Sequence, residues 1–324
     1  MSNSLTGYYP PAWNAIARAD LRILAAFAAT YIFWGGTFLA VAVALPSIPP
    51  FLLMGSRSLA GGVILFAYAK YRGARTPAPL WLIAGGCGLL LFVGCHGVMA
   101  FAQQRVPSGV TAIILATIPF WIAIIGFVIP SKKPPRLLTL ALLIPGLAGV
   151  ALIAWEQVTS GVAGSRLVDI ALLLGASFSW ALGSLLLERN TSRENCAITM
   201  SGMALIVGGI ALVSISVAAG EFQHFQLQGL SMASAVGWLY LLIAGTILAF
   251  GSYVWLLERV SPTLVATYTF VNPIIAVLLG WAILGEPFSL SALAGGALVV
   301  ISIIGLLFFD PAPAKTETSR GDDA

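Results

Sequence analysis

The sequence predicts an all-α membrane protein with ten transmembrane helices arranged as two inverted five-helix repeats. Three observations predict this fold class. The 324 residues are 59% apolar and only 9% charged, whereas a soluble domain has about 25% charged residues. The apolar residues fall into ten separate segments, and five sites in the first half recur in the second half at one constant spacing. The composition excludes a soluble enzyme, a disordered protein and a nucleic-acid-binding protein.

The ten apolar segments are each close to the length of about 20 residues that a membrane-spanning helix needs. We expect helices because lipid offers no water to bond with backbone groups. The strands of a β-barrel would alternate between apolar and polar residues, and these segments are apolar on all sides. The segments cover residues 23–45, 50–69, 80–102, 108–129, 137–155, 167–187, 197–219, 236–257, 263–284 and 289–309.

The segments divide the chain into five parts. Residues 1–22 form an N-terminal segment, 23–155 the first repeat, 156–166 a linker, 167–309 the second repeat, and 310–324 a polar tail that we expect to be disordered. The first apolar stretch is too long for the core of a cleavable signal peptide. We therefore expect it to remain as the first transmembrane helix.

The Lys and Arg residues predict the orientation in the membrane. Thirteen of the 16 fall in the two tails or in alternate connections, Arg105 and Arg166 fall in the other connections, and Arg57 lies within an apolar segment. Cytoplasmic connections carry the excess of Lys and Arg. This bias places the N- and C-termini in the cytoplasm and the 156–166 linker outside.

The internal repeat appears at a spacing of 154 residues. Each copy holds five helices, and because five is odd, the two copies enter the membrane in opposite orientations. Inverted repeats are typical of secondary transporters, whose substrate site lies near the bilayer midplane between the halves. The matches are Arg105-Val106-Pro107-Ser108-Gly109 with Arg259-Val260-Ser261-Pro262-Thr263, Gly97 with Gly251, Ala112 with Ala266, Pro119 with Pro273, and Gly126 with Gly280.

Several motifs give the sequence a family resemblance. They are Trp34-Gly35-Gly36-Thr37-Phe38, Arg57-Ser58-Leu59-Ala60-Gly61-Gly62, Val106-Pro107-Ser108-Gly109, Ser179-Trp180-Ala181-Leu182-Gly183-Ser184, and the stretch from Val271-Asn272-Pro273 to Gly280. From about Leu21 to Phe309 the chain resembles the EamA family of the drug/metabolite transporter superfamily, and it is most like the YedA-type permeases. The resemblance implies a bacterial inner-membrane location, a central cavity, the fifth and tenth helices at the periphery, and export of amino acids or other small metabolites.

Arg57 is the one clear charge inside an apolar segment. A cation at the bilayer centre costs about 2.5–3.5 kcal/mol on insertion scales, and such residues usually face a cavity or a partner. One interpretation is a contact for an anionic group, such as a substrate carboxylate. The other is a structural arginine that reaches outward or bonds helix-end carbonyls.

His96 lies in the third apolar segment, where it is a candidate for proton coupling, because the ordinary pKa of histidine is about 6.5. The alternative is a neutral histidine bonded within the bundle. Asp and Glu are absent from the middle of every apolar segment, which argues against a relay of carboxylates. Transport coupled to a proton and facilitated transport without a coupling ion are both still possible mechanisms.

Aromatic and small polar residues are candidates for the cavity wall, because a ring-lined site with few polar groups suits small amphiphilic ligands. The alternative for each ring is packing or a place at the membrane interface. Paired prolines and glycines are candidates for a gate, or else for fixed kinks. The cavity candidates are Trp34, Thr37, Arg57, His96, Thr117, Trp121, Trp180, Ser184, Tyr253, Tyr268 and Asn272, and the gate candidates are Gly97, Pro119, Gly251 and Pro273.

These features together predict a secondary active or facilitative transporter that exports small organic solutes by alternating access. We expect no cofactor, no metal and no nucleic-acid partner, and a monomer or weak homodimer in the lipid bilayer. The alternatives are a membrane-embedded lipid-modifying enzyme or a channel. The sequence has no HExxH motif or paired carboxylates for the first, and no repeated polar ring for the second.

Overall fold

The computed structural model describes residues 21–128, 137–159, 167–190, 197–257, 259–260, 265, 268–286 and 289–309. Every regular element in this part of the chain is helical. The elements are α2 (Leu21–Ala44), α3 (Pro50–Tyr71), α4 (Ala78–Gly88), η1 (Leu89–Gly97), α5 (Val98–Gln103), α6 (Ser108–Leu115), α7 (Ile118–Val128), α8 (Leu137–Thr159), α9 (Leu167–Asn190), α10 (Ala197–Ala218), α11 (Glu221–His224), η2 (Leu227–Gly229), α12 (Met232–Tyr240), η3 (Leu241–Phe250), α13 (Gly251–Leu257), α15 (Tyr268–Leu284) and α16 (Leu290–Phe309).

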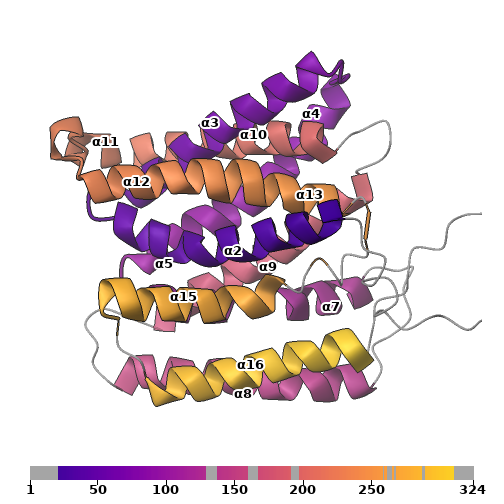
Figure 1. The fold of residues 1–324 in the computed structure, drawn as a ribbon, viewed down its shortest axis with the longest axis vertical. Coiled ribbons are helices and arrows are strands. Elements are labelled where there is room, and N and C mark those ends of the chain that lie inside the picture. Colours follow the sequence, from indigo (N-terminus) through magenta and orange to yellow (C-terminus); the bar gives the residue numbers. More distant parts are fainter. Residues whose placement is uncertain are drawn as a thin grey trace, which may run out of the picture.

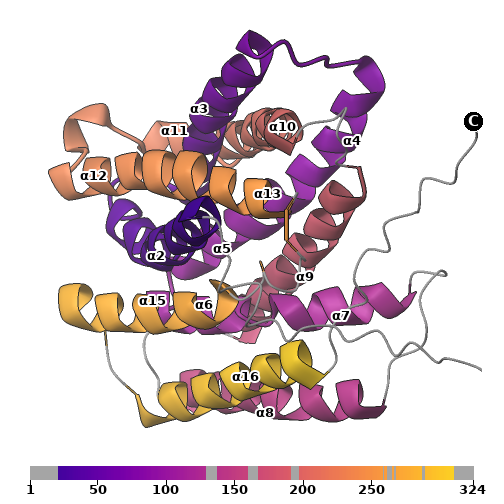
Figure 2. The ribbon, with the colours of Figure 1, turned by 45° about the vertical axis from the view of Figure 1, so that its right-hand side comes forward.

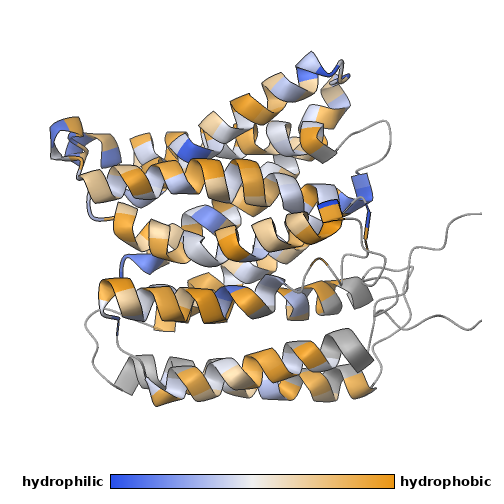
Figure 3. Ribbon diagram, in the orientation of Figure 1, coloured by the Kyte–Doolittle hydropathy of each residue, from blue (hydrophilic) through white to orange (hydrophobic). Residues whose placement is uncertain are grey.

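Six helical stretches among the described residues are long and apolar enough to cross a membrane. They are Leu21–Ala44, Pro50–Tyr71, Ala78–Gln103, Leu167–Asn190, Ile198–Ala218 and Met232–Leu256, and shorter apolar helices cover Ser108–Ile122, Val271–Leu284 and Leu293–Ser302. Hydrophilic residues gather where the helices end, and the helix bodies are mostly apolar (Figure 3). Large apolar side chains such as Leu82, 81% exposed, face outward. The prediction of an all-α fold is confirmed for the described residues, and these apolar helices are consistent with a membrane protein.

The helices run roughly side by side in layers (Figures 1 and 2). The helices α3, α10 and α4 pack together on one side, and α2 lies between the α12–α13 helix and α15. The pair α8 and α16 forms the opposite edge. These two helices approach closely because Gly149 has no side chain, and a Cβ placed on it would lie 2.4 Å from the Gly295 carbonyl oxygen. Because the pair lies at the edge, it is away from the centre of the bundle, as we expect for the fifth and tenth segments.

Proline and serine set several helix starts. Pro50 is the first residue of α3, and Pro107 directly precedes α6. Proline suits the first turn of a helix because the backbone N–H that it lacks has no partner there. The Oγ of Ser231 accepts a hydrogen bond from the Ser234 backbone N–H at 3.0 Å and so caps α12.

Three of the predicted helices are less regular than their apolar patterns suggest. The 80–102 and 236–257 segments each contain a π-helical stretch, η1 and η3, and the 108–129 segment is interrupted between Leu115 and Ile118. Gly97 is the last residue of η1, and Gly251, its counterpart at the spacing of 154, directly follows η3. The two π-helical stretches thus occupy nearly matching places in the two halves. Such stretches are rare and are frequent at functional sites.

Some predicted features lie outside the described residues. These are residues 1–20 of the N-terminal segment, 160–166 of the linker, the 310–324 tail, and the repeat matches at 261–263 and Ala266. The segment predicted at 263–284 is described as a continuous helix only from Tyr268.

Candidate functional site: a central aromatic cavity

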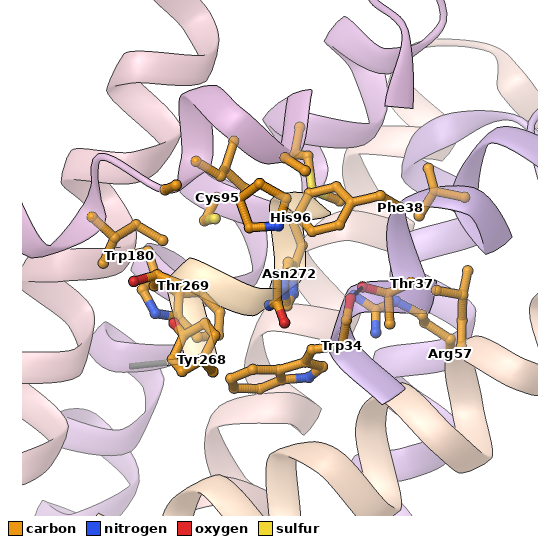
Figure 4. Close-up of a pocket in the computed structure, with 18 residues that line it drawn as sticks. Trp34, Thr37, Phe38, Arg57, Cys95, His96, Trp180, Tyr268, Thr269 and Asn272 are labelled. Carbon is orange, nitrogen blue, oxygen red and sulfur yellow. Dashed lines mark hydrogen bonds between the residues drawn. The ribbon is translucent and has the colours of Figure 1, made fainter. Parts of the chain in front are cut away.

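A cavity lies among α2, α3, η1, α5, α6, α7, α9, η3 and α15 (Figure 4). About 70 Å³ is open to the centre of a water molecule, and a single water needs about 10–15 Å³ by that measure. The cavity therefore has room for several waters or one small solute. The lining residues are Trp34, Thr37, Phe38, Val41, Arg57, Cys95, His96, Met99, Ala112, Leu115, Ala116, Ile118, Trp180, Leu241, Tyr268, Thr269, Asn272 and Pro273.

Aromatic rings form one wall of this cavity around Trp34, near the middle of α2. The Trp34 ring centroid lies 4.7 Å from Tyr268 and 5.8 Å from Trp180, both in edge-to-face geometry. Its indole N–H donates to the Gly245 carbonyl oxygen at 3.0 Å, which fixes the ring against η3. Tyr253 packs against Trp34 in a tilted arrangement, with ring centroids 5.0 Å apart, but does not line the cavity. The rings are held in place before any solute arrives.

Arg57, on α3, provides the cavity with a cation that is only 4% exposed. Its Nε donates to the Met54 sulfur at 3.1 Å, and its Nη1 donates to the Thr246 hydroxyl at 3.0 Å. The Thr246 hydroxyl in turn donates to the Leu241 carbonyl oxygen at 2.9 Å. Among the described residues, no carboxylate lies within ion-pair distance of this guanidinium.

Three further polar atoms at the cavity are buried without a hydrogen-bond partner among the described residues. They are the His96 Nδ1, the Trp180 Nε1 and the Asn272 Oδ1. A buried polar atom without a partner costs about 1–3 kcal/mol, so such atoms in proteins are usually satisfied by water or a ligand. These atoms can therefore form hydrogen bonds with a solute or with water beside the aromatic wall.

The structure brings seven of the eleven predicted cavity residues into this lining: Trp34, Thr37, Arg57, His96, Trp180, Tyr268 and Asn272. The other four lie outside it. The Thr117 hydroxyl donates to the Ile114 carbonyl oxygen at 2.7 Å, and the Trp121 ring packs edge-on against Phe178. Ser184 accepts a hydrogen bond from the Tyr253 hydroxyl at 3.4 Å.

The four gate candidates have unequal surroundings. Pro119 is in the first turn of α7, directly after the interruption that separates α6 from α7. Pro273 lies inside the continuous helix α15 and lines the cavity. Gly97 ends η1 and packs against Leu212, whereas Gly251 has open space around it. The prolines match in sequence, but only the helix with Pro119 is interrupted beside it.

Sequence reasoning missed Thr246, which positions Arg57. It is the single side-chain hydroxyl in the stretch Leu241–Phe250, and an isolated polar residue in an apolar span is a signal that could have found it. It also missed Phe38, Val41 and Leu241, which no pattern separates from ordinary packing residues.

Three carboxylates connect distant segments at one end of the molecule, which we call the Glu286 end. This end is at the left of Figure 1, where α11 and the C-terminal end of α15 lie. Glu286 accepts hydrogen bonds from the Ser108 N–H and hydroxyl, both at 2.8 Å, and so caps α6. Glu221 accepts from the Leu52 N–H at 2.9 Å in the same way on α3.

The third carboxylate, that of Asp169 on α9, forms a salt bridge with Arg105 after α5. Their closest atoms are 2.6 Å apart, and the guanidinium makes three hydrogen bonds to the two carboxylate oxygens. The hydrogen bonds to Asp169 raise the pKa of Arg105 above its ordinary value. The described residues contain no group of three or more His, Cys, Asp or Glu that could hold a metal ion.

Several known proteins similar to this chain are named as transporters or efflux pumps. An Escherichia coli K12 protein named "Uncharacterized inner membrane transporter YedA" is 34% identical over 305 residues, which cover 92% of this chain and 95% of the relative. The "Probable amino-acid metabolite efflux pump" of Salmonella typhimurium is 28% identical and covers 84% of this chain and 90% of its own length. Protein PecM of Dickeya dadantii is 27% identical and likewise covers 84% of this chain and 90% of its own length.

A solved structure described only as "Crystal structure of protein" has the same fold, with a TM-score of 0.64, at 18% sequence identity. It covers 90% of this chain and 98% of its own length. The sequence profile described as the EamA-like transporter family matches residues 21–155 and 168–308. These matches confirm the resemblance read from the motifs, and they point to membrane transport and away from an enzyme. The chain belongs to the EamA-like transporter family.

Proposed function

We propose that this protein is a secondary active or facilitative transporter that exports small organic solutes across the inner membrane by alternating access. Amino acids and related amphiphilic metabolites or drugs are the candidate solutes. The observation that carries the proposal is the central cavity, since its lining comes from both segments that the family profile matches. A site between two halves is where a transporter of this architecture binds its substrate.

The contacts at the Glu286 end support a closed gate on that side of the cavity. Glu286 and Glu221 belong to the second matched segment, and they cap helices of the first. The salt bridge between Arg105 and Asp169 also joins the two segments. Opening a path to the cavity from this end would require these contacts to break together. We expect this end to face outward, because it carries few Lys and Arg residues.

The proposal includes ten spanning helices in two inverted repeats, 23–155 and 167–309, with both termini in the cytoplasm. The two profile matches and the two similarly placed π-helical stretches support a repeated unit. We propose a monomer or weak homodimer in the bilayer. A proton is the candidate coupling ion, because His96 lines the cavity.

The name of the Salmonella typhimurium relative, a probable amino-acid metabolite efflux pump, supports export as the direction. The direction of transport and its coupling to a proton need tests of their own, separate from the test of transport. Replacing His96 with Gln should flatten a dependence of flux on pH between about 5.5 and 7.5 if the proton couples there. A pH profile identical to that of the wild type would exclude His96 as the coupling residue.

Counterflow in proteoliposomes tests the proposal. Vesicles loaded with an unlabelled solute are diluted into the labelled solute, and accumulation is compared with that of protein-free vesicles. The panel contains amino acids, aryl carboxylates and organic amines. We expect saturable accumulation of at least one solute. Protein that is folded in the same vesicles but moves none of the panel would argue against the transporter proposal.

A further inference from the structure

We propose that the solute of the central cavity is a small organic monoanion, a carboxylate on a flat apolar body without an ammonium group. This inference rests on the proposed function and names its substrate class. It follows from the charges, the unpaired polar atoms and the rings that line the cavity.

The charge balance of the cavity carries the first step. The 18 lining residues include one permanent cation, Arg57, and no Asp or Glu. The guanidinium is 4% exposed, and a buried charge is costly unless it is paired and hydrogen-bonded. A ligand with a single negative charge would neutralise the cavity, whereas a cationic ligand would add a second positive charge to it.

The geometry of Arg57 leaves donors available for such a ligand. Its two described hydrogen bonds, to Met54 and Thr246, occupy two of its five N–H donors,. Three donors are therefore left for a carboxylate. Hydrogen bonds between guanidinium and carboxylate are charge-assisted and roughly twice as strong as neutral ones. Arg57 and Thr37 lie at one side of the cavity in Figure 4, away from Trp180 and Tyr268.

The same lining disfavours an ammonium group. The unpartnered acceptor that it offers, the Asn272 Oδ1, is on a side chain that carries no negative charge. The faces of Trp34 and Tyr268 could attract a cation, but such contacts contribute only about 0.5–2 kcal/mol. An ammonium group would lose its water shell without meeting a carboxylate. A zwitterion should therefore bind more weakly than the anion of the same shape.

The rings determine the body of the ligand. Trp34, Trp180 and Tyr268 line the cavity together with Phe38 and other apolar side chains. Flat apolar groups pack well against such walls, by offset stacking or edge-to-face contact. The small open volume of about 70 Å³ limits the body to about the size of one ring unless the cavity expands.

A matched series of three ligands tests the inference on the wild-type, full-length protein. The ligands are 3-phenylpropionate, phenylalanine and phenethylamine, which share a phenyl group and differ in charge. Binding is measured by titration calorimetry on detergent-purified protein at pH 7. We expect 3-phenylpropionate to bind at least about tenfold more tightly than the other two, because a hydrogen-bonded charge contributes that much or more.

Equal or tighter binding of phenylalanine or phenethylamine would overturn the inference, and so would the absence of binding by all three. Binding of 3-phenylpropionate without counterflow would support the ligand class while arguing against transport. The two proposals therefore fail in distinguishable ways.

Two variants of Arg57 extend the test. Arg57→Gln should remove the preference for the anion, and Arg57→Lys should retain part of it, because lysine keeps the charge but loses the planar fork. Thermal unfolding checks that each variant is folded. An unchanged preference in folded Arg57→Gln protein would contradict the role assigned to Arg57. The ligand series on the wild-type protein tests the ligand class even if neither variant folds.

Discussion

Arg57 is useful in the cavity only if its guanidinium points in one direction. The Thr246 hydroxyl holds it there, accepting from Nη1 at 3.0 Å and donating to the Leu241 carbonyl oxygen at 2.9 Å. Thr246 lies five positions after Leu241, and both residues belong to the π-helical stretch η3. The hydroxyl of Thr246 therefore connects the π-helical stretch η3 to the buried guanidinium of Arg57. Thr246 is a positioning residue for Arg57.

Thr246→Val should weaken binding of 3-phenylpropionate by about tenfold or more, because a hydrogen bond to a charged group contributes about 1.5–3 kcal/mol. Valine keeps the branched shape of threonine and replaces the hydroxyl with a methyl group. Thr246→Ser is the matched control and should keep most of the affinity. Calorimetry on the three proteins measures the effect, and equal loss in both variants would mean that packing, not the hydroxyl, is responsible.

The Arg105–Asp169 pair is asymmetric in exposure, with 32% of the Arg105 side chain and 2% of the Asp169 side chain accessible. Arg105→Ala would remove three hydrogen bonds from a buried carboxylate, whereas Asp169→Ala would remove them from a guanidinium that water can reach. We therefore expect Arg105→Ala to lower the thermal midpoint more. The reverse order, measured in detergent, would contradict this description of the pair.

The direction of the pKa shift also predicts how the pair responds to base. The pKa of Arg105 is raised, so its contribution to stability is fully present below the ordinary pKa of arginine and is lost only as pH rises through the raised pKa. The Arg105-dependent part of stability, which is the difference between wild type and Arg105→Ala, should stay constant between about pH 7 and 10. A difference that shrinks in this range would mean that Arg105 loses its proton earlier.

At the scale of elements, the α15–α16 connection and α6 depend on each other. Gly285 turns the chain at φ +64°, so that the Glu286 N–H reaches the Gly280 carbonyl oxygen at 3.2 Å. The Glu286 carboxylate then caps α6 through Ser108 and Gly109. A negative charge is favourable at a helix N-terminus. Space for the carboxylate exists because residue 280 has no side chain.

Gly280→Ala should therefore destabilise the protein by about 1–3 kcal/mol. The added Cβ would lie 2.3 Å from a Glu286 oxygen and 2.8 Å from the Ser108 hydroxyl oxygen. Gly175→Ala is the matched control, because it adds the same methyl group to a helix where nothing lies within 4 Å. That substitution should be neutral or stabilising. Equal thermal midpoints for the two variants would show that the Glu286 cap tolerates displacement.

The sequence predicted helices well where apolar runs have clear boundaries, as for 50–69 against the observed Pro50–Tyr71. It predicted neither η1 nor η3, since a segment that is apolar on all sides looks the same in α- and π-helical geometry. It placed Arg57 and Asn272 in the cavity because polar groups inside spans stand out. The Glu286 cap depends on residues 178 positions apart, a pairing that local patterns do not reveal.

At the scale of the whole molecule, the charges predict which end faces the cytoplasm. The Glu286 end carries few Lys and Arg residues, whereas at the other end Lys70 lies in the last turn of α3 and Arg72 and Arg75 lie in the connection after it. We expect both termini on that basic side. Green fluorescent protein fused to the C-terminus should fluoresce, and alkaline phosphatase fused there should be inactive. Active phosphatase would reverse the predicted orientation.

Alternating access makes a further demand on the whole molecule, namely that the two matched segments separate at the Glu286 end. A Cβ placed on Gly109, in the first turn of α6, would lie 3.5 Å from the Cβ of Val277 on α15. A disulfide needs Cβ atoms about 3.5–4.5 Å apart. Gly109→Cys combined with Val277→Cys should therefore form a crosslink between the segments.

Counterflow through this double variant shows whether the Glu286 end must open for a solute to cross. We expect flux to stop when the crosslink is oxidised and to return when a reductant opens it, while Val277→Cys alone keeps its flux under both conditions. Mass spectrometry measures how completely the crosslink forms. Undiminished flux through fully crosslinked protein would contradict the claim that solutes cross by opening and closing of this end around the central cavity.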